Sequence, residues 1–157
     1  MRSDDARFLF AYDRWATRKV LAMAVGVPME DWAEGNRIDR RGLAGIMIHQ
    51  LGAHERWRSG WQDAPTDRRR EREEIVMPED LAEDWEAEWV LLDAYLAGLT
   101  EEDMDRDLDG IPLWQTIAHL VNHGTQHRSE AAAILTGFGR SPGDLDLIDF
   151  AEQIAAG

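Results

Sequence analysis

Apolar residues recur every three or four positions along most of the chain, and charged residues fill the positions between them. This period is typical of an α-helix with one buried face, whereas a half-buried strand alternates every second residue. Proline or glycine lies near the ends of most periodic segments, where helices start and stop. The pattern therefore predicts helices over residues 4–25, 43–62, 78–98 and 113–137, and a short fifth helix capped by Asp144.

Capping residues and breaks in the period indicate how these helices are connected. Ser3 is the expected N-cap of the first helix, and Pro78 suits the first turn of the third. Residues 28–41 and 100–110 lack a period, so we interpret them as connections, the first of them pinned by Trp32. No segment predicts a strand. The expected fold class is all-α, a four-helix bundle formed by one domain over residues 1–157.

Composition and charge narrow the classes of function. The net charge of −14 disfavours a nucleic-acid binder, because such proteins carry clustered basic residues. The arginines of residues 67–74 alternate with acids, which predicts a solvated, self-paired surface. The chain begins without an apolar leader and has no apolar run of membrane-spanning length, so we expect a cytoplasmic protein without a membrane span. Seven tryptophans predict an aromatic core, with those at helix ends available for a homodimer interface.

Three of the five histidines, His119, His123 and His127, stand four residues apart in the helix predicted over 113–137. Two imidazoles at this spacing lie on one face of a helix and can share a cation. The outer two are about 12 Å apart, so all three cannot bind the same ion. Because the chain has no cysteine, a metal must be held by histidine, carboxylate or water.

A helical wheel ranks the three histidines against the centre of the buried stripe. His127 lies about 50° from that centre, His123 about 90° and His119 about 130°. The wheel therefore favours His123 and His127 at the edge of the core, with Gly124 between them allowing a close approach of a neighbouring helix or a ligand.

A further ligand is expected from the helix over 43–62, where His49 and His54 are the remaining histidines. His54 falls near the centre of the buried stripe and His49 on its flank, which suits a core residue and a cleft residue respectively. Periodicity leaves both open, and Glu55 is a further oxygen ligand to consider.

Several motifs resemble one known family. They are the segment Tyr12-Asp13-Arg14-Trp15-Ala16, His49 with Trp57 eight residues on, and above all HLVNHGTQHRSEAAAIL followed by DLDLIDF. Together they are similar to the DinB-like (DinB/YfiT) metalloenzyme superfamily over essentially the whole chain. The resemblance implies an up-down-down-up bundle with a long crossover between the second and third helices. It also implies a divalent metal bound by His49, His123 and His127, with His119 outside the ligand set.

Two positions depart from that family's pattern. Members commonly carry Gly-Gln after His-Arg where this chain has Ser129-Glu130, and an acid where it has His54. Both departures concern groups around the expected metal. We expect His54 to be either a group that surrounds the metal ligands without binding the ion or a pH-sensitive core residue.

Three imidazoles leave a coordination position open, as in catalytic metal sites. Zinc is the first expectation for the ion, followed by nickel or iron. Some relatives resemble transferases that use bacillithiol, mycothiol or glutathione, which suggests a thiol-dependent S-transferase acting on a small-molecule substrate. The alternatives are a metal-dependent hydrolase, a non-enzymatic stress-associated metal-binding protein and a helical interaction protein without metal. Candidates for a general base are Glu55, His54, Asp13 and Glu130.

Overall fold

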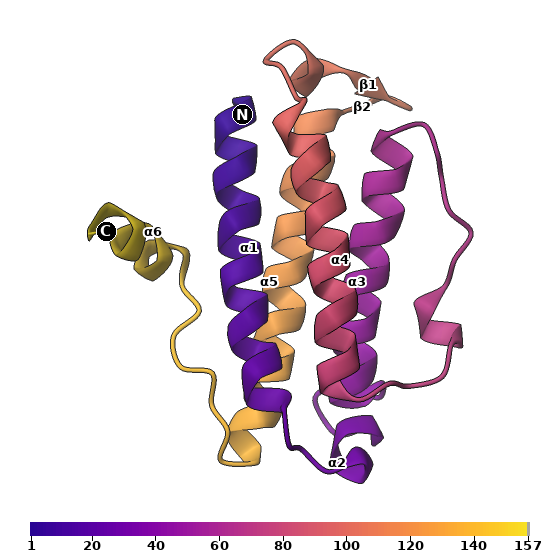
Figure 1. Cartoon of the computed structure of the whole chain (residues 1–157), viewed down its shortest axis with the longest axis vertical. Helices are drawn as coiled ribbons and strands as arrows, with labels where there is room; N and C mark the ends of the chain where they lie inside the picture. Colours follow the sequence, from indigo (N-terminus) through magenta and orange to yellow (C-terminus); the bar gives the residue numbers. More distant parts are fainter. Residues whose placement is uncertain (157) are drawn as a thin grey trace.

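The structure is a computed structural model that describes residues 1–156. Its four long helices lie side by side, with α1 and α5 running in one direction and α3 and α4 in the other (Figure 1). This arrangement confirms the predicted all-α bundle and its up-down-down-up order. The helices are α1 (Ser3–Ala24), α3 (Gly42–Trp61), α4 (Pro78–Ala97) and α5 (Leu113–Gly137).

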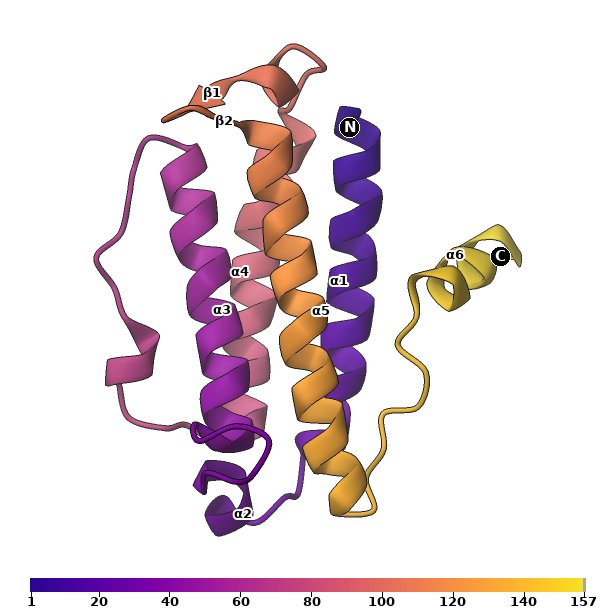
Figure 2. The same cartoon turned by 180° about the vertical axis from the view of Figure 1, so that it is seen from behind.

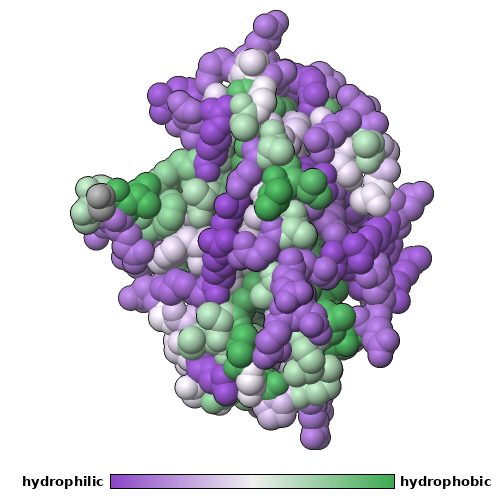
Figure 3. Space-filling model, viewed as in Figure 1, coloured by the Kyte–Doolittle hydropathy of each residue, from purple (hydrophilic) through white to green (hydrophobic). Residues whose placement is uncertain are grey.

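The apolar stripes of these helices face one another and form the core. α5 packs against both α3 and α1, and α4 packs against the same two helices from the other side. Four of the seven tryptophans are no more than 2% exposed, which agrees with the predicted aromatic core. The face seen in Figure 3 is mostly hydrophilic, with scattered apolar patches. The fully buried tryptophans are Trp32, Trp61, Trp85 and Trp89.

A long crossover joins the parallel helices α3 and α4 and runs along the outside of the bundle (Figure 2). It contains the 3-10 turn η1 (Arg70–Arg72). The prediction of a solvated, self-paired surface here is right for Arg68, which pairs with Glu73 at 2.7 Å. It is wrong for Arg70, which is 8% exposed and pairs with Glu55 and Asp84. The crossover is therefore anchored to the bundle by a buried arginine.

The segment between α1 and α3 is more regular than predicted, because it contains the short helix α2 (Met29–Ala33). Trp32 of this helix is fully buried, as expected of a residue that pins the connection. Its Nε1 donates a hydrogen bond to the carbonyl oxygen of Val76 at 2.8 Å. Trp32 thus ties α2 to the end of the crossover.

The connection before α5 contains a β-hairpin, so the prediction of no strand is wrong. After the 3-10 turn η2 (Asp103–Asp105), β1 (Asp107–Leu108) pairs antiparallel with β2 (Ile111–Pro112). The turn residues Asp109 and Gly110 both have positive φ, 55° and 89°. Asp-Gly is a strong hairpin signal, but strands of two residues are too short to show alternation.

The two ends of the chain also depart from the predicted caps. Ser3 lies inside α1, whose N-cap is Arg2, and the Ser3 hydroxyl donates to Glu101 Oε1 at 2.7 Å. The last helix, α6 (Leu147–Ala156), begins three residues after the expected cap Asp144. It lies beside α1 (Figure 1), where the Phe150 ring packs 5.6 Å from that of Phe8. None of the helices within residues 1–156 combines the length and apolar character that crossing a bilayer requires.

Candidate metal centre

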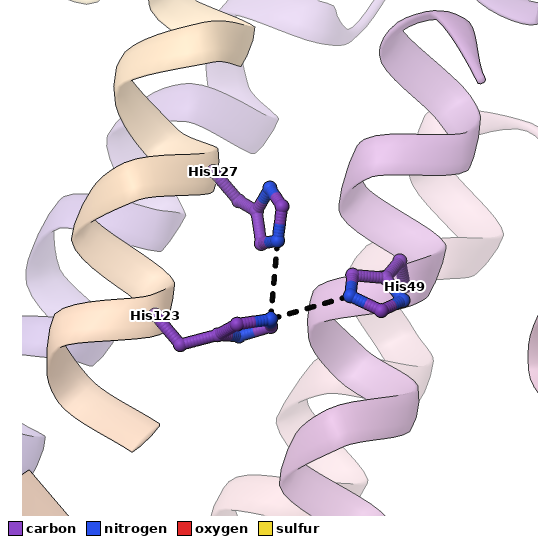
Figure 4. A group of neighbouring side chains, drawn as sticks. All are labelled: His49, His123 and His127. Carbon is purple, nitrogen blue, oxygen red and sulfur yellow. Dashed lines mark hydrogen bonds between the residues drawn. The ribbon is translucent and has the colours of Figure 1, made fainter. Parts of the chain in front are cut away.

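Three histidine side chains converge between α3 and α5 (Figure 4). His123 and His127 stand one turn apart on α5, and His49 faces them from α3. The Nε2 atom of His123 lies 3.2 Å from His49 Nε2 and 3.1 Å from His127 Nε2. Ligand atoms of all three lie within 4.8 Å of one another. The structure thus brings together the three histidines that the family resemblance implied.

These separations suit a transition metal. Imidazole nitrogens bind zinc at about 2.0–2.1 Å, which places neighbouring ligand nitrogens about 2.8–3.4 Å apart in octahedral or tetrahedral geometry. The two Nε2 distances of 3.1 and 3.2 Å at His123 fall in this interval. Two of the three nitrogen pairs therefore already have the separation expected of ligands that share one cation.

In His49 and His127, the hydrogen bond of Nδ1 determines which ring nitrogen carries the proton and which is free to bind a metal. His49 Nδ1 lies 2.8 Å from Glu71 Oε1, and His127 Nδ1 lies 2.7 Å from Glu130 Oε2. An ionised carboxylate only accepts hydrogen bonds, so each Nδ1 is the donor; in a neutral ring with its proton on Nδ1, the Nε2 atom presents a lone pair. A proton on His123 Nε2 can satisfy only one of these lone pairs, whereas a cation satisfies all three nitrogens. The donor set thus fits a metal ion, and the carboxylates orient the rings as in other histidine metal sites.

Burial also favours the neutral imidazole that binds metals. It lowers the pKa of His123 to about 4, with help from the neighbouring histidines. Burial likewise lowers the pKa of His49, although the hydrogen bond with Glu71 acts in the opposite direction. At neutral pH both rings are therefore uncharged, which is the form of imidazole that binds a metal.

The remaining histidines lie as the helical patterns predicted. Exposure decreases along α5 from His119, which is exposed, through His123 to His127, which is 5% exposed. The His119 ring packs edge-on against Trp57, at 5.5 Å between centroids. His54 is 1% exposed and its ring packs edge-on against Trp85 at 4.9 Å. His54 is therefore a core residue, and burial lowers its pKa.

A buried polar layer lies behind the histidine cluster. Arg128 donates to Asp13 Oδ1, and both side chains are at most 1% exposed. Gln50 Nε2 and Arg128 Nη1 each lie 3.4 Å from the Thr17 hydroxyl. A Cβ atom on Gly124 would come within 2.6 Å of Asp13 Oδ1, so the predicted close approach at this glycine is confirmed. The layer joins α1, α3 and α5 next to the ligand positions.

The four general-base candidates have different surroundings. The Glu55 carboxylate accepts two 2.7 Å hydrogen bonds from Arg70. Asp13 is paired with Arg128, and His54 lies in the core beside Asp13, 3.4 Å from its Oδ2 atom. Glu130 is the candidate that contacts a ligand ring, through His127.

Sequence reasoning missed Glu71. It belongs to the charge run of the crossover, which has no period to indicate which side chain turns inward. Arg56 also lies near its carboxylate, 3.4 Å from Oε1.

Comparison with known proteins agrees with this arrangement. A family model described as the DinB family matches residues 2–155, a range that includes α1 to α5 and all three converging histidines. No match was found among curated proteins or among solved structures.

Proposed function

The chain belongs to the DinB family, and on that premise we propose that it is a metal-dependent enzyme whose divalent ion is held by His49, His123 and His127. The observation that carries the proposal is the convergence of three Nε2 atoms at 3.1 and 3.2 Å, with a carboxylate on the outer nitrogen of two rings. Zinc is the first expectation for the ion, with nickel and iron as alternatives that imidazole also suits.

The protein supplies three ligands and leaves further positions open on the exposed side of the cluster. His49 and His123 are both partly exposed, whereas His127 is buried. Structural zinc sites are closed by four protein ligands, so an open position favours catalysis. When bound, a divalent ion there supplies a Lewis acid that lowers the pKa of a water or thiol beside it.

Of the reactions open to such a site, we favour transfer of a small-molecule thiol to an electrophile. The chain has no cysteine, so the sulfur must come from a second substrate such as bacillithiol, mycothiol or glutathione. The thiol loses its proton to solvent, its sulfur forms a bond to an electrophilic carbon, and the leaving group departs with the electron pair of the broken bond. His49, His123 and His127 hold the ion, and Glu71 and Glu130 keep their rings oriented.

An activity screen tests this proposal. Protein loaded with one equivalent of Zn²⁺, Ni²⁺ or Fe²⁺ is incubated with each thiol and a panel of alkyl and aryl electrophiles, and thioether formation is measured. We expect turnover that requires both metal and thiol and that is lost in His123→Ala. Product release that requires metal but no thiol would identify a hydrolase instead. Stoichiometric metal without turnover would favour the non-enzymatic metal-binding protein.

A further inference from the structure

A second concave site lies at the hairpin end of the bundle, beyond His119. The pocket has a volume of about 500 Å³ and is bounded by the ends of α3 and α5 and by the β1–β2 hairpin. Two tryptophans form an aromatic wall, and aspartates from the hairpin and from the end of α3 form a polar rim. The residues that matter below are Trp57, Trp61, Asp63, Asp107, Asp109 and Thr116.

The aromatic wall is fixed in place by contacts behind it. Trp61 is 1% exposed, and its Nε1 donates to the Thr116 hydroxyl at 3.0 Å. Trp57 is partly exposed and packs 6.3 Å from Trp61 between ring centroids. Trp57 is the partly exposed ring of the wall, so a ligand in the pocket can lie against it.

The side chains that line the pocket give it a negative charge. Its lining includes three aspartates and, within the described residues, no lysine, arginine or histidine. The nearby Arg106 hydrogen-bonds uncharged groups: its Nη2 donates to the Trp61 carbonyl oxygen at 2.6 Å and to the Tyr95 hydroxyl at 3.3 Å. The whole chain carries a net charge of −14, which attracts cations to such a site.

A comparable pocket elsewhere in the molecule contains a lysine side chain over its tryptophan ring. A cavity of about 470 Å³ beside Trp15 also combines a tryptophan with acidic residues. There the chain supplies its own cation, because Lys19 Nζ lies 4.5 Å from the centroid of the Trp15 ring. Among the cation–aromatic contacts found within residues 1–156, none involves Trp57.

From these contacts we propose that the pocket beside Trp57 binds an organic cation, a ligand with an ammonium-type head and an apolar or aromatic body. The head lies over the Trp57 face and near the aspartates, and the body fills the space against the wall formed with Trp61. Cations bind tryptophan faces more strongly than other aromatic rings.

A row of neighbouring rings leads from the pocket to the metal centre. The Trp57 ring lies 5.5 Å from His119, and the His119 ring lies 5.9 Å from His123, between centroids. Thr116 and His123 are separated by about 10 Å along α5. If the proposed metal enzyme is correct, on which this step rests, the bound cation is its substrate and the reacting end extends past His119 to the ion.

Binding is tested on the full-length, metal-free protein with benzyltrimethylammonium as the probe and benzyl alcohol as its neutral counterpart. Backbone amide NMR shifts locate the site, and their titration gives the Kd. We expect shifts in residues 57–63 and 107–116, and tighter binding of the cation than of the alcohol. Equal affinity for the two probes, or shifts confined to other elements, would overturn the proposal.

Variants separate the contribution of the Trp57 ring from that of the aspartates. Trp57→Leu should weaken binding of the cation about two- to fivefold, whereas Trp15→Leu, at the pocket that contains its own lysine, should leave it unchanged. Asp63→Asn with Asp109→Asn should also weaken it and reduce its salt dependence. Asparagine tolerates the positive φ of both positions, 57° and 55°, so this variant keeps the fold even if Trp57→Leu does not. Unchanged binding in the aspartate variant would refute the site.

A paramagnetic ion tests the link to the metal centre. In protein loaded with Co²⁺, the proton signals of the bound probe should broaden, and the broadening should disappear in His123→Ala. Binding without broadening in Co²⁺-loaded protein would separate the cation site from the metal centre and refute the substrate assignment. Failure of Co²⁺ to bind would instead refute the proposed function, while the titration of metal-free protein still decides the cation site.

Discussion

Replacing Gly124 by alanine tests how closely α5 approaches the buried ion pair behind the histidines. The new Cβ would lie 2.6 Å from Asp13 Oδ1 and 2.7 Å from Arg128 Nη1, so both partners of the pair must move. Overpacking of a core costs about 1–3 kcal/mol. Weakening the pair adds about 2 kcal/mol, roughly half the cost of losing a buried ion pair. The better helix propensity of alanine returns about 1 kcal/mol. We expect a net loss of about 2–4 kcal/mol in the free energy of unfolding.

Urea unfolding of metal-free protein, followed by far-UV circular dichroism, measures this loss. The matched control is Gly137→Ala, on the same helix, where an added Cβ meets nothing within 4 Å. The control should be unchanged or stabilised by up to about 1 kcal/mol. If Gly124→Ala stays within about 0.5 kcal/mol of the wild type, the close approach of α5 to the ion pair is refuted.

Three further predictions follow from individual contacts. Glu71→Gln and Glu130→Gln should each weaken Zn²⁺ binding about 10- to 100-fold without changing helicity. Competition with a fluorescent chelator measures the affinity. An unchanged affinity would show that the substituted carboxylate does not support metal binding. Trp32→Phe should lower the free energy of unfolding by about 1–3 kcal/mol, because it shrinks a fully buried side chain and removes its hydrogen bond. A urea titration that shows no loss of stability would contradict the role of Trp32 in holding α2 against the crossover. The hydrogen bond with Arg41 lowers the pKa of Asp39 to about 2. Its stabilisation, about 1 kcal/mol or less, is fully present above about pH 4 and is lost as the pH falls towards 2. The stability difference between wild type and Asp39→Asn should therefore narrow over that interval, and a constant difference would rule out the contribution of Asp39.

The long helices and the burial of their histidines could be predicted from period alone. In a helix with one buried face, the angle of each residue from that face determines how exposed its side chain is. The helical wheel therefore ordered His119, His123 and His127 correctly by exposure. It also identified Gly124 as a point of close approach. These properties depend on a single helix and its neighbours in sequence.

Contacts between residues on different helices could not be derived from the period, because they depend on how the two helices are rotated relative to each other. Choosing His49 over His54 requires knowing which face of α3 meets α5, and only the family resemblance indicated it. Glu71 reaches His49 from 22 residues further along the chain, through a crossover without a period. The hairpin turn at Asp109 and Gly110 carried a local signal, but strands of two residues gave no pattern to support it.

The central claim is that one divalent ion binds His49, His123 and His127. The most direct measurement is a Zn²⁺ titration of metal-free, untagged protein by isothermal calorimetry, compared with His123→Ala and with His119→Ala, an exposed histidine one turn away on the same helix. We predict one site per chain in the wild type, its loss in His123→Ala and its retention in His119→Ala. Zn²⁺ binding that survives in His123→Ala at wild-type affinity, or no binding in the wild type, would contradict the account.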